Sequence, residues 1–371
     1  MKKYLFTMAT ATMLFASCSS DDALTNENGA LENQEDLVEI KLGTGSRIGT
    51  SVAVSKAAVD NWDDTQIGVY ALNTATPWIN ATGQLGIIDL MENALGIVAA
   101  DADNAANAIS WEDEETRYYP RGGSATDKYK FYGYYPYSED AVINAEGTAV
   151  TVEGAFDGET DIMRGCTADG YNAASFRGEN PASTPDIVFN HLTTRLKFKA
   201  VRGVNYEDHL GQCKILSMEI YAPKTYKLII ADGSTEDADA IIWPEDVQGQ
   251  GNWDYHELTA QNDAVFNGGY VIPESESEVP DYIADAMVVP GMGNSAEDKY
   301  ILKITLSNEE NPTQTFVQDV NIIAPESLTA GFEMGKAYTI TLTINGPQDI
   351  KVTATLTAWD EVENDDLEFD I

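Results

Sequence analysis

The sequence predicts an all-β protein built from two Greek-key β-sandwich domains in series. Short segments that alternate apolar and polar residues recur along the chain, clusters of Gly, Pro, Asn and Asp separate them, and helix signals are few. At 371 residues, the chain also exceeds the length that one hydrophobic core usually serves. These observations together indicate two all-β domains.

Residues 1–17 have the form of a lipoprotein signal peptide. Lys2 and Lys3 precede an apolar stretch, 4–16, that is too short to persist as a membrane anchor. A pair of small residues then precedes Cys18, as in a bacterial lipobox, which predicts cleavage before Cys18 and acylation of its thiol. The alternative is an ordinary secretory signal in which the cysteine is incidental.

Residues 18–36 are polar and acidic, which predicts a flexible tether between the lipid and the fold. The tetrapeptide Ser-Ser-Asp-Asp at 19–22 resembles the acidic export tag that directs lipoproteins of Bacteroidales-type bacteria to the outer face of the outer membrane. No later segment reaches 18 continuous apolar residues, so membrane attachment is expected to depend on the lipid. Surface display is the expected localisation.

The first strand is predicted at 37–43, where Val38, Ile40 and Leu42 occupy every second position. A Gly- and Ser-rich loop around Arg47 follows it. The remaining predicted strands are 66–72, 128–137, 148–154, 185–201, 213–222, 226–231, 270–273, 285–291, 299–307, 314–323, 336–345 and 349–359.

The domain boundary is predicted at the polar stretch 178–185, which contains two prolines. The N-terminal sandwich domain is therefore expected to span 37–184 and the C-terminal one 185–371. The segment 91–109, rich in Ala and Asn, is expected to be a short helix or a loop insertion.

Charge excludes some classes of partner. The chain has 61 acidic and 22 basic side chains, a formal net charge of −39, and processing would remove Lys2 and Lys3 as well. Nucleic acids and anionic lipids are therefore poor partners.

Signals of catalysis are weak. None of the three histidines lies in a zinc-protease motif, no nucleophile elbow or nucleotide-binding loop occurs, and His191 on an alternating strand is expected to be structural. Abundant carboxylates leave a glycosidase-like pair open, because such pairs are defined by distance in space. The acidic clusters at 101–104 and 232–239 lack the spacing of a calcium loop, so no metal or other cofactor is expected.

Two features keep alternatives open. Tyr118, Tyr119 and the tyrosines of 129–137 are expected in the core and in cross-strand pairs, with a carbohydrate-stacking face as the alternative. Cys166 and Cys213 form either one disulfide or two separate buried thiols.

Several segments recur in a recognisable order, and the most specific are FYGYYPY, DIVFNHLTTRL and the closing block GKAYTITL...TAW. Together they resemble the fimbrillin family, the FimA-like and Mfa-like pilins of type V pili in Bacteroidales, and the resemblance covers essentially the whole mature chain. It implies a fold of two transthyretin-like β-sandwich domains. It also implies a structural subunit rather than an enzyme, with other pilin subunits and accessory tip or anchor proteins as partners.

The resemblance also implies a route of maturation. Family pilins are exported as lipoproteins, cut by an arginine-specific protease in a loop after the first strand, and polymerised by strand exchange. Arg47 occupies that loop here. Ile48 follows it, whereas many relatives have Ala at this point.

A donor strand for such an exchange is expected near the C-terminus. Its apolar face would consist of Ile350, Val352, Ala354, Leu356 and Ala358. Leu367, Phe369 and Ile371 repeat the alternation. Alternatively, both segments complete their own domain. The other functions left open are a non-polymerising tip or anchor component of the same pili and a carbohydrate-binding surface lipoprotein.

Overall fold

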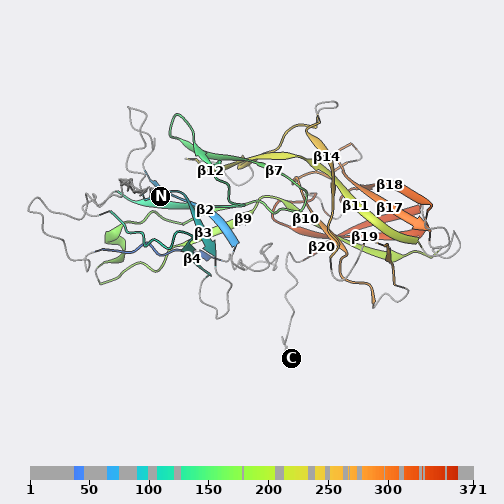
Figure 1. The fold of residues 1–371 in the computed structure, drawn as a ribbon, viewed down its shortest axis with the longest axis horizontal. Helices are drawn as coiled ribbons and strands as arrows, with labels where there is room; N and C mark the ends of the chain where they lie inside the picture. The colour runs from blue at the N-terminus through green and yellow to red at the C-terminus, as the bar shows by residue number, and fades with distance from the viewer. Residues whose placement is uncertain are drawn as a thin grey trace, which may run out of the picture.

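The computed structural model shows an all-β chain, elongated along one axis (Figure 1). The described part of the chain contains no α-helix; its one named helical element is the 3-10 turn Ala173–Phe176. None of its helices could cross a membrane. The structure describes residues 37–45, 65–74, 90–98, 107–120, 127–177, 179–204, 213–232, 239–246, 251–261, 266, 268–273, 278–295, 297–308, 313–325, 328, 331–346 and 349–357.

One half of the molecule is a closed barrel. Its strands follow one another in the order β1, β4, β3, β2, β5, β8, β9, and β9 pairs with β1 to complete the ring. The bounds are β1 Gly43–Gly45, β2 Thr65–Asn73, β3 Met91–Val98, β4 Asn107–Trp111, β5 Tyr129–Tyr135, β8 Met163–Cys166 and β9 Asp186–His191.

The other half consists of two packed sheets (Figure 1). The first has the order β16, β10, β19, β20, and the second has the order β14, β11, β17, β18, with β15 also pairing with β11. The bounds are β10 Thr194–Arg202, β11 Cys213–Pro223, β14 Trp253–Glu257, β15 Tyr270–Val271, β16 Ala284–Val288, β17 Tyr300–Asn308, β18 Thr315–Ile322, β19 Ala337–Gly346 and β20 Asp349–Thr357.

A further sheet joins the two halves. Its order is β13, β12, β7, β6, with bounds β6 Val142–Ile143, β7 Ala149–Ala155, β12 Thr225–Asp232 and β13 Ile241–Ile242. The ladder between β7 and β12 runs from the Ala155–Thr225 pair to the Ala149–Asp232 pair. This ladder therefore connects segments on opposite sides of the domain boundary that was predicted between 184 and 185. The position of the boundary stays a prediction.

The expectation of a helix or loop insertion is wrong for the described residues of 91–109. The described residues of this segment form β3 and the first part of β4, and from Ala94 to Val98 every second residue is buried. Pairing with β2 outweighs the helix propensity of the alanines, since propensity is a weak effect next to tertiary packing. At the start of β3, Asn93 has a φ of 51° beside a bulge in the β2 ladder.

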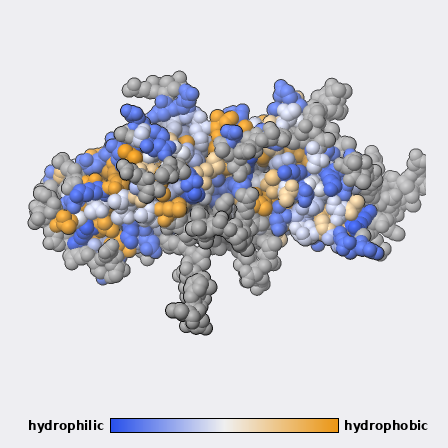
Figure 2. Space-filling view, turned by 180° about the vertical axis from the view of Figure 1, so that it is seen from behind, coloured by the Kyte–Doolittle hydropathy of each residue, from blue (hydrophilic) through white to orange (hydrophobic). Residues whose placement is uncertain are grey.

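Two hydrophobic cores follow from this arrangement. The barrel encloses one core, which includes Ile40, Leu42, Phe131 and Ile187. The second core extends from Tyr70 and Tyr134 through the joining sheet into the sandwich, where Phe332 and Tyr338 are fully buried. On the face seen in Figure 2, hydrophobic residues lie in small groups among hydrophilic ones, as is usual for a folded surface.

Gly165 lies where strands β8 and β9 of the barrel approach each other closely. A Cβ at this position would overlap the backbone oxygen of Val188 on β9. We expect Gly165→Ala to destabilise the protein by about 1–3 kcal/mol, because β8 and β9 would have to separate. Urea unfolding measures the change. Glu92→Ala, an exposed position on β3, is the control and should stay within about 0.5 kcal/mol of the wild type.

Candidate subunit interface

Residues 37–45 close the barrel by lying between two neighbouring parts of the chain. On one side β1 pairs antiparallel with β4, and on the other it pairs parallel with β9. Before β1, the Ile40 amide donates to the Arg117 carbonyl at 2.8 Å and the Tyr119 amide donates to the Val38 carbonyl at 3.0 Å. The segment therefore has backbone partners along most of its length.

The side chains of this segment follow the predicted alternation. Ile40 and Leu42 are 3% and 2% exposed and belong to the barrel core, and Val38 packs against the same core. Glu39 and Lys41 between them are exposed and form an ion pair at 3.3 Å. The segment thus contributes both backbone pairing and apolar filling to the barrel.

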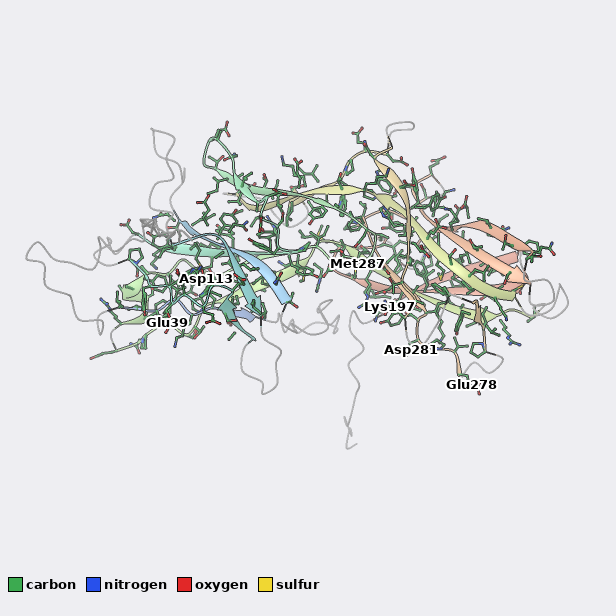
Figure 3. All side chains as sticks on the ribbon, viewed as in Figure 1. Glu39, Asp113, Lys197, Glu278, Asp281 and Met287 are labelled. Atoms are coloured by element: carbon green, nitrogen blue, oxygen red, sulfur yellow. The ribbon has the colours of Figure 1, made fainter. Side chains whose placement is uncertain are left out.

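A turn at residues 113–117, fixed by an ion pair, lies beside the start of residues 37–45. The Arg117 guanidinium binds the Asp113 carboxylate at 2.5 and 3.0 Å and lies 4.8 Å from the centre of the Trp111 ring. Hydrogen bonds from this guanidinium hold the pKa of Asp113 below its ordinary value. Figure 3 labels Asp113 and Glu39 in the same half of the molecule. The Arg117 carbonyl, which accepts the hydrogen bond from the Ile40 amide, therefore lies in a turn that is fixed by the contact between Arg117 and Asp113.

Tyr119 lies behind the segment in the barrel core. It stacks on Phe176 at 5.3 Å and meets Phe131 edge-on at 6.1 Å, and burial raises the pKa of its hydroxyl. That hydroxyl has no hydrogen-bond partner among the residues that the structure describes. Tyr119 is therefore core, as expected from the sequence, whereas Tyr118 is 37% exposed.

Removing residues 37–45 would open the barrel. Strands β4 and β9 would each be left with unpaired backbone groups, and the core around Ile109 and Ile187 would lose the cover of Ile40 and Leu42. Unpaired edges and exposed apolar surface are both costly in water. An opened barrel would therefore accept another strand in the same place.

The predicted donor strand lies in the chain's own sandwich. Strand β20 pairs antiparallel with β19, from the Ile344–Ile350 pair to the Ala337–Thr357 pair, and has no second neighbour in the described sheet order. Ala354 is 8% exposed, Ile350 and Val352 pack against the sandwich core, and Leu356 is 44% exposed. In the single chain, β20 thus completes its own domain, which is the alternative interpretation of this segment.

Other predicted site residues lie outside the described residues. These are Cys18, Arg47, Ile48 and Ala358, as well as the terminal residues from Leu367 to Ile371. Strand β1 ends at Gly45, two positions before Arg47. Their roles stay predictions.

The remaining polar candidates have structural surroundings. His191 is buried, with Nδ1 2.6 Å from Asp161 Oδ2, and the Thr193 hydroxyl donates to the other oxygen of the same carboxylate at 2.9 Å. Cys166 and Cys213 are free thiols rather than a disulfide. Among the described residues, no group of His, Cys, Asp and Glu is arranged to hold a metal ion.

Comparisons with known proteins are consistent with this geometry. The sequence matches the family described as fimbrillin-like over residues 55–359, and no curated protein matches. A putative cell adhesion protein from Bacteroides uniformis has 18% identity and a TM-score of 0.50, with 89% of this chain and all of that one covered. A fimbrial protein from Bacteroides vulgatus has 12% identity and a TM-score of 0.47, covering 87% and 99%. The likeness to the Bacteroides uniformis protein shows the fold alone.

The contribution of residues 37–45 to barrel stability can be measured with neighbouring substitutions. We expect Ile40→Ala and Leu42→Ala each to cost about 2–5 kcal/mol, because each deletes a large buried side chain. Lys41→Ala, between them but exposed, should leave stability within about 0.5 kcal/mol. Chemical unfolding of the three uncut variants makes the comparison; equal effects at all three positions would contradict a core role for the segment.

Proposed function

The chain belongs to the fimbrillin-like family, and we propose that it is a structural pilin subunit of a cell-surface fimbria that supports adhesion. One observation carries the proposal: residues 37–45, which end in β1, complete the barrel by pairing with β4 on one side and β9 on the other. A strand at that position can be replaced by one from a neighbouring subunit, which supplies main-chain hydrogen bonds and alternate apolar side chains.

Maturation in this proposal begins with export as a lipoprotein of the outer membrane, anchored through Cys18. An arginine-specific protease then cuts between Arg47 and Ile48. The position of Arg47 just after β1 supports this step, because a cut there detaches the complete segment with Val38, Ile40 and Leu42. The lipid leaves with the same fragment.

Polymerisation then uses the carboxy-terminal part of the next subunit. The proposed donor face is Ile350, Val352, Ala354, Leu356 and Ala358, and in β20 it would first have to separate from β19. The alternating tail that ends at Ile371 extends the same part of the chain. Such a head-to-tail contact does not close on itself, so it generates a filament.

The finer fold assignment belongs to the same proposal. In it, the two domains are transthyretin-like Greek-key folds with a boundary near 184. The N-terminal domain, whose barrel also includes β9 at Asp186–His191, is closed by its own first strand until cleavage. The partners are other pilin subunits together with accessory tip and anchor proteins. The role is structural rather than enzymatic.

Cleavage is tested with Arg47→Ala in cells that assemble the fimbria. We expect an uncut chain that keeps its lipid and forms no boiling-resistant ladder on denaturing gels, because residues 37–45 stay in the barrel. A palmitate analogue should label this variant and fail to label Cys18→Ala. Lys41→Ala should be cut and polymerised like the wild type. Full-length ladders from Arg47→Ala, or polymers whose sequence begins before Ile48, would contradict the proposal.

The donor strand is tested with Leu356→Asp. This side chain is 44% exposed in the single chain, so the variant should fold and be cut, yet a charge in an apolar groove should abolish ladders. Thr355→Asp places the same charge on the opposite face of β20 and should polymerise. Deletion of residues 358–371 is a second test. This variant should form no ladders if the terminal segment is the donor strand. Normal ladders from both Leu356→Asp and the deletion would exclude this end of the chain as the donor.

A further inference from the structure

Three aromatic side chains gather on the outward face of the sandwich sheet that contains β14 and β11. Tyr221 on β11 lies directly opposite Tyr255 on β14, with ring centres 5.2 Å apart, and its ring lies 5.6 Å from that of Trp253. All three are half-buried. We call these three residues the aromatic platform.

Strand register places the platform outside the core. Ile220, next to Tyr221 on β11, is fully buried within the sandwich. Because neighbouring side chains on a strand point to opposite faces, Tyr221 and its partner Tyr255 point outward. Figure 1 shows β14 and β11 side by side at the upper part of the sandwich. The platform is therefore a surface feature of two adjacent strands.

Hydrogen bonds fix the three rings. The Tyr221 hydroxyl donates to Asp246 Oδ1 at 3.0 Å, the Tyr255 hydroxyl to Asp319 Oδ1 at 3.3 Å, and the Trp253 indole to the Pro244 carbonyl at 2.8 Å. Burial, together with the adjacent carboxylate, raises the pKa of both tyrosines, so their hydroxyls remain donors at neutral pH. Rings fixed before a ligand arrives lose little conformational entropy when it binds.

Charge selects among possible ligands. Lys303 Nζ lies 3.6 Å from the centre of the Tyr255 ring and 2.6 Å from Glu219 Oε2, so a cation of the protein itself already occupies that ring. Asp246 and Asp319 lie beside the platform, and the whole chain has a net charge of −39. Anionic ligands would be repelled, and a neutral ligand remains.

We propose that the aromatic platform is a binding site for a neutral glycan. The C–H face of a pyranose ring stacks on the electron-rich faces of Tyr221 and Trp253, and sugar hydroxyls donate to the carboxylates of Asp246 and Asp319. This site lies on the sandwich, on different strands from residues 37–45 and β20. Binding is therefore independent of cleavage and of polymerisation.

The test uses the purified, unpolymerised mature chain on a microarray of neutral, sialylated and sulfated glycans, followed by calorimetric titration of the neutral glycan retained most strongly. We expect Trp253→Ala and Tyr221→Ala each to weaken that binding at least about tenfold, equivalent to roughly 1.4 kcal/mol. Tyr118→Ala, an exposed tyrosine of the barrel half, should bind like the wild type. Trp253→Phe, which keeps an aromatic ring, should lose less than Trp253→Ala.

The melting temperature of each platform variant shows whether a variant that has lost binding is still folded. If Trp253→Ala does not fold, Trp253→Phe and Tyr221→Ala decide the question by the same titration. Retention of no neutral glycan, retention of sialylated or sulfated glycans only, or wild-type affinity in folded platform variants would overturn the proposal. Capture of a protein through the platform without any glycan binding would overturn it too.

Discussion

Closure of the barrel by residues 37–45 is the contact on which the first half of the molecule depends. Antiparallel pairing to β4 and parallel pairing to β9 make this short segment the bridge between two strands that do not pair with each other. Every other barrel strand in the described order lies at residue 65 or later. The most N-terminal described segment is therefore also the one whose loss would turn a closed ring into an open sheet with two exposed edges.

Where the barrel meets the sandwich, the chain is held by buried polar contacts rather than by a loose linker. Only Leu192 and Thr193 separate β9 from β10, and the Leu192 amide donates to the Ile162 carbonyl at 2.8 Å. Thr193 binds Asp161, as His191 does, and its hydroxyl is 3.6 Å from the Met287 sulfur, labelled near the middle of the molecule in Figure 3. Together with the β7–β12 ladder, these contacts join the two halves through hydrogen bonds and buried side chains.

The alternation of apolar and polar residues along the sequence was sufficient to predict the strands that pack one face against a core. Val38, Ile40 and Leu42 show the expected pattern, and so do the strands from β17 to β20. Pairing over long sequence distances was not predictable: nothing local in β7 indicates that its partner is β12. The Ala-rich composition of 91–109 gave the wrong local signal, because β3 is stabilised by its neighbouring strands rather than by its own residues.

The aromatic platform was missed for a related reason. The segment WDYHE at 253–257 is short and polar, and its Trp and Tyr acquire a common face with Tyr221 only when β14 pairs with β11, about thirty residues earlier in the chain. The tyrosines that the sequence made conspicuous, such as Tyr129 and Tyr134, are buried at 2% and 0% exposure. Composition can thus show that aromatic residues are abundant, whereas strand pairing decides which of them face outward.

The energetics of strand exchange set different demands on the strand that leaves and the strand that enters. Burying one aliphatic side chain stabilises a fold by roughly 1.5–3 kcal/mol, and Ile40 and Leu42 are both nearly fully buried. Their loss would remove a large part of the ~5–15 kcal/mol that typically stabilises a domain, so an opened barrel should bind a replacement strongly. Strand β20 offers small Ala354 within its apolar face, whereas the terminal Leu367, Phe369 and Ile371 are all large. In the proposed exchange, Ile350, Val352 and Leu356 of the donor face would supply the large side chains that such a groove lacks, and the terminal residues would extend that face.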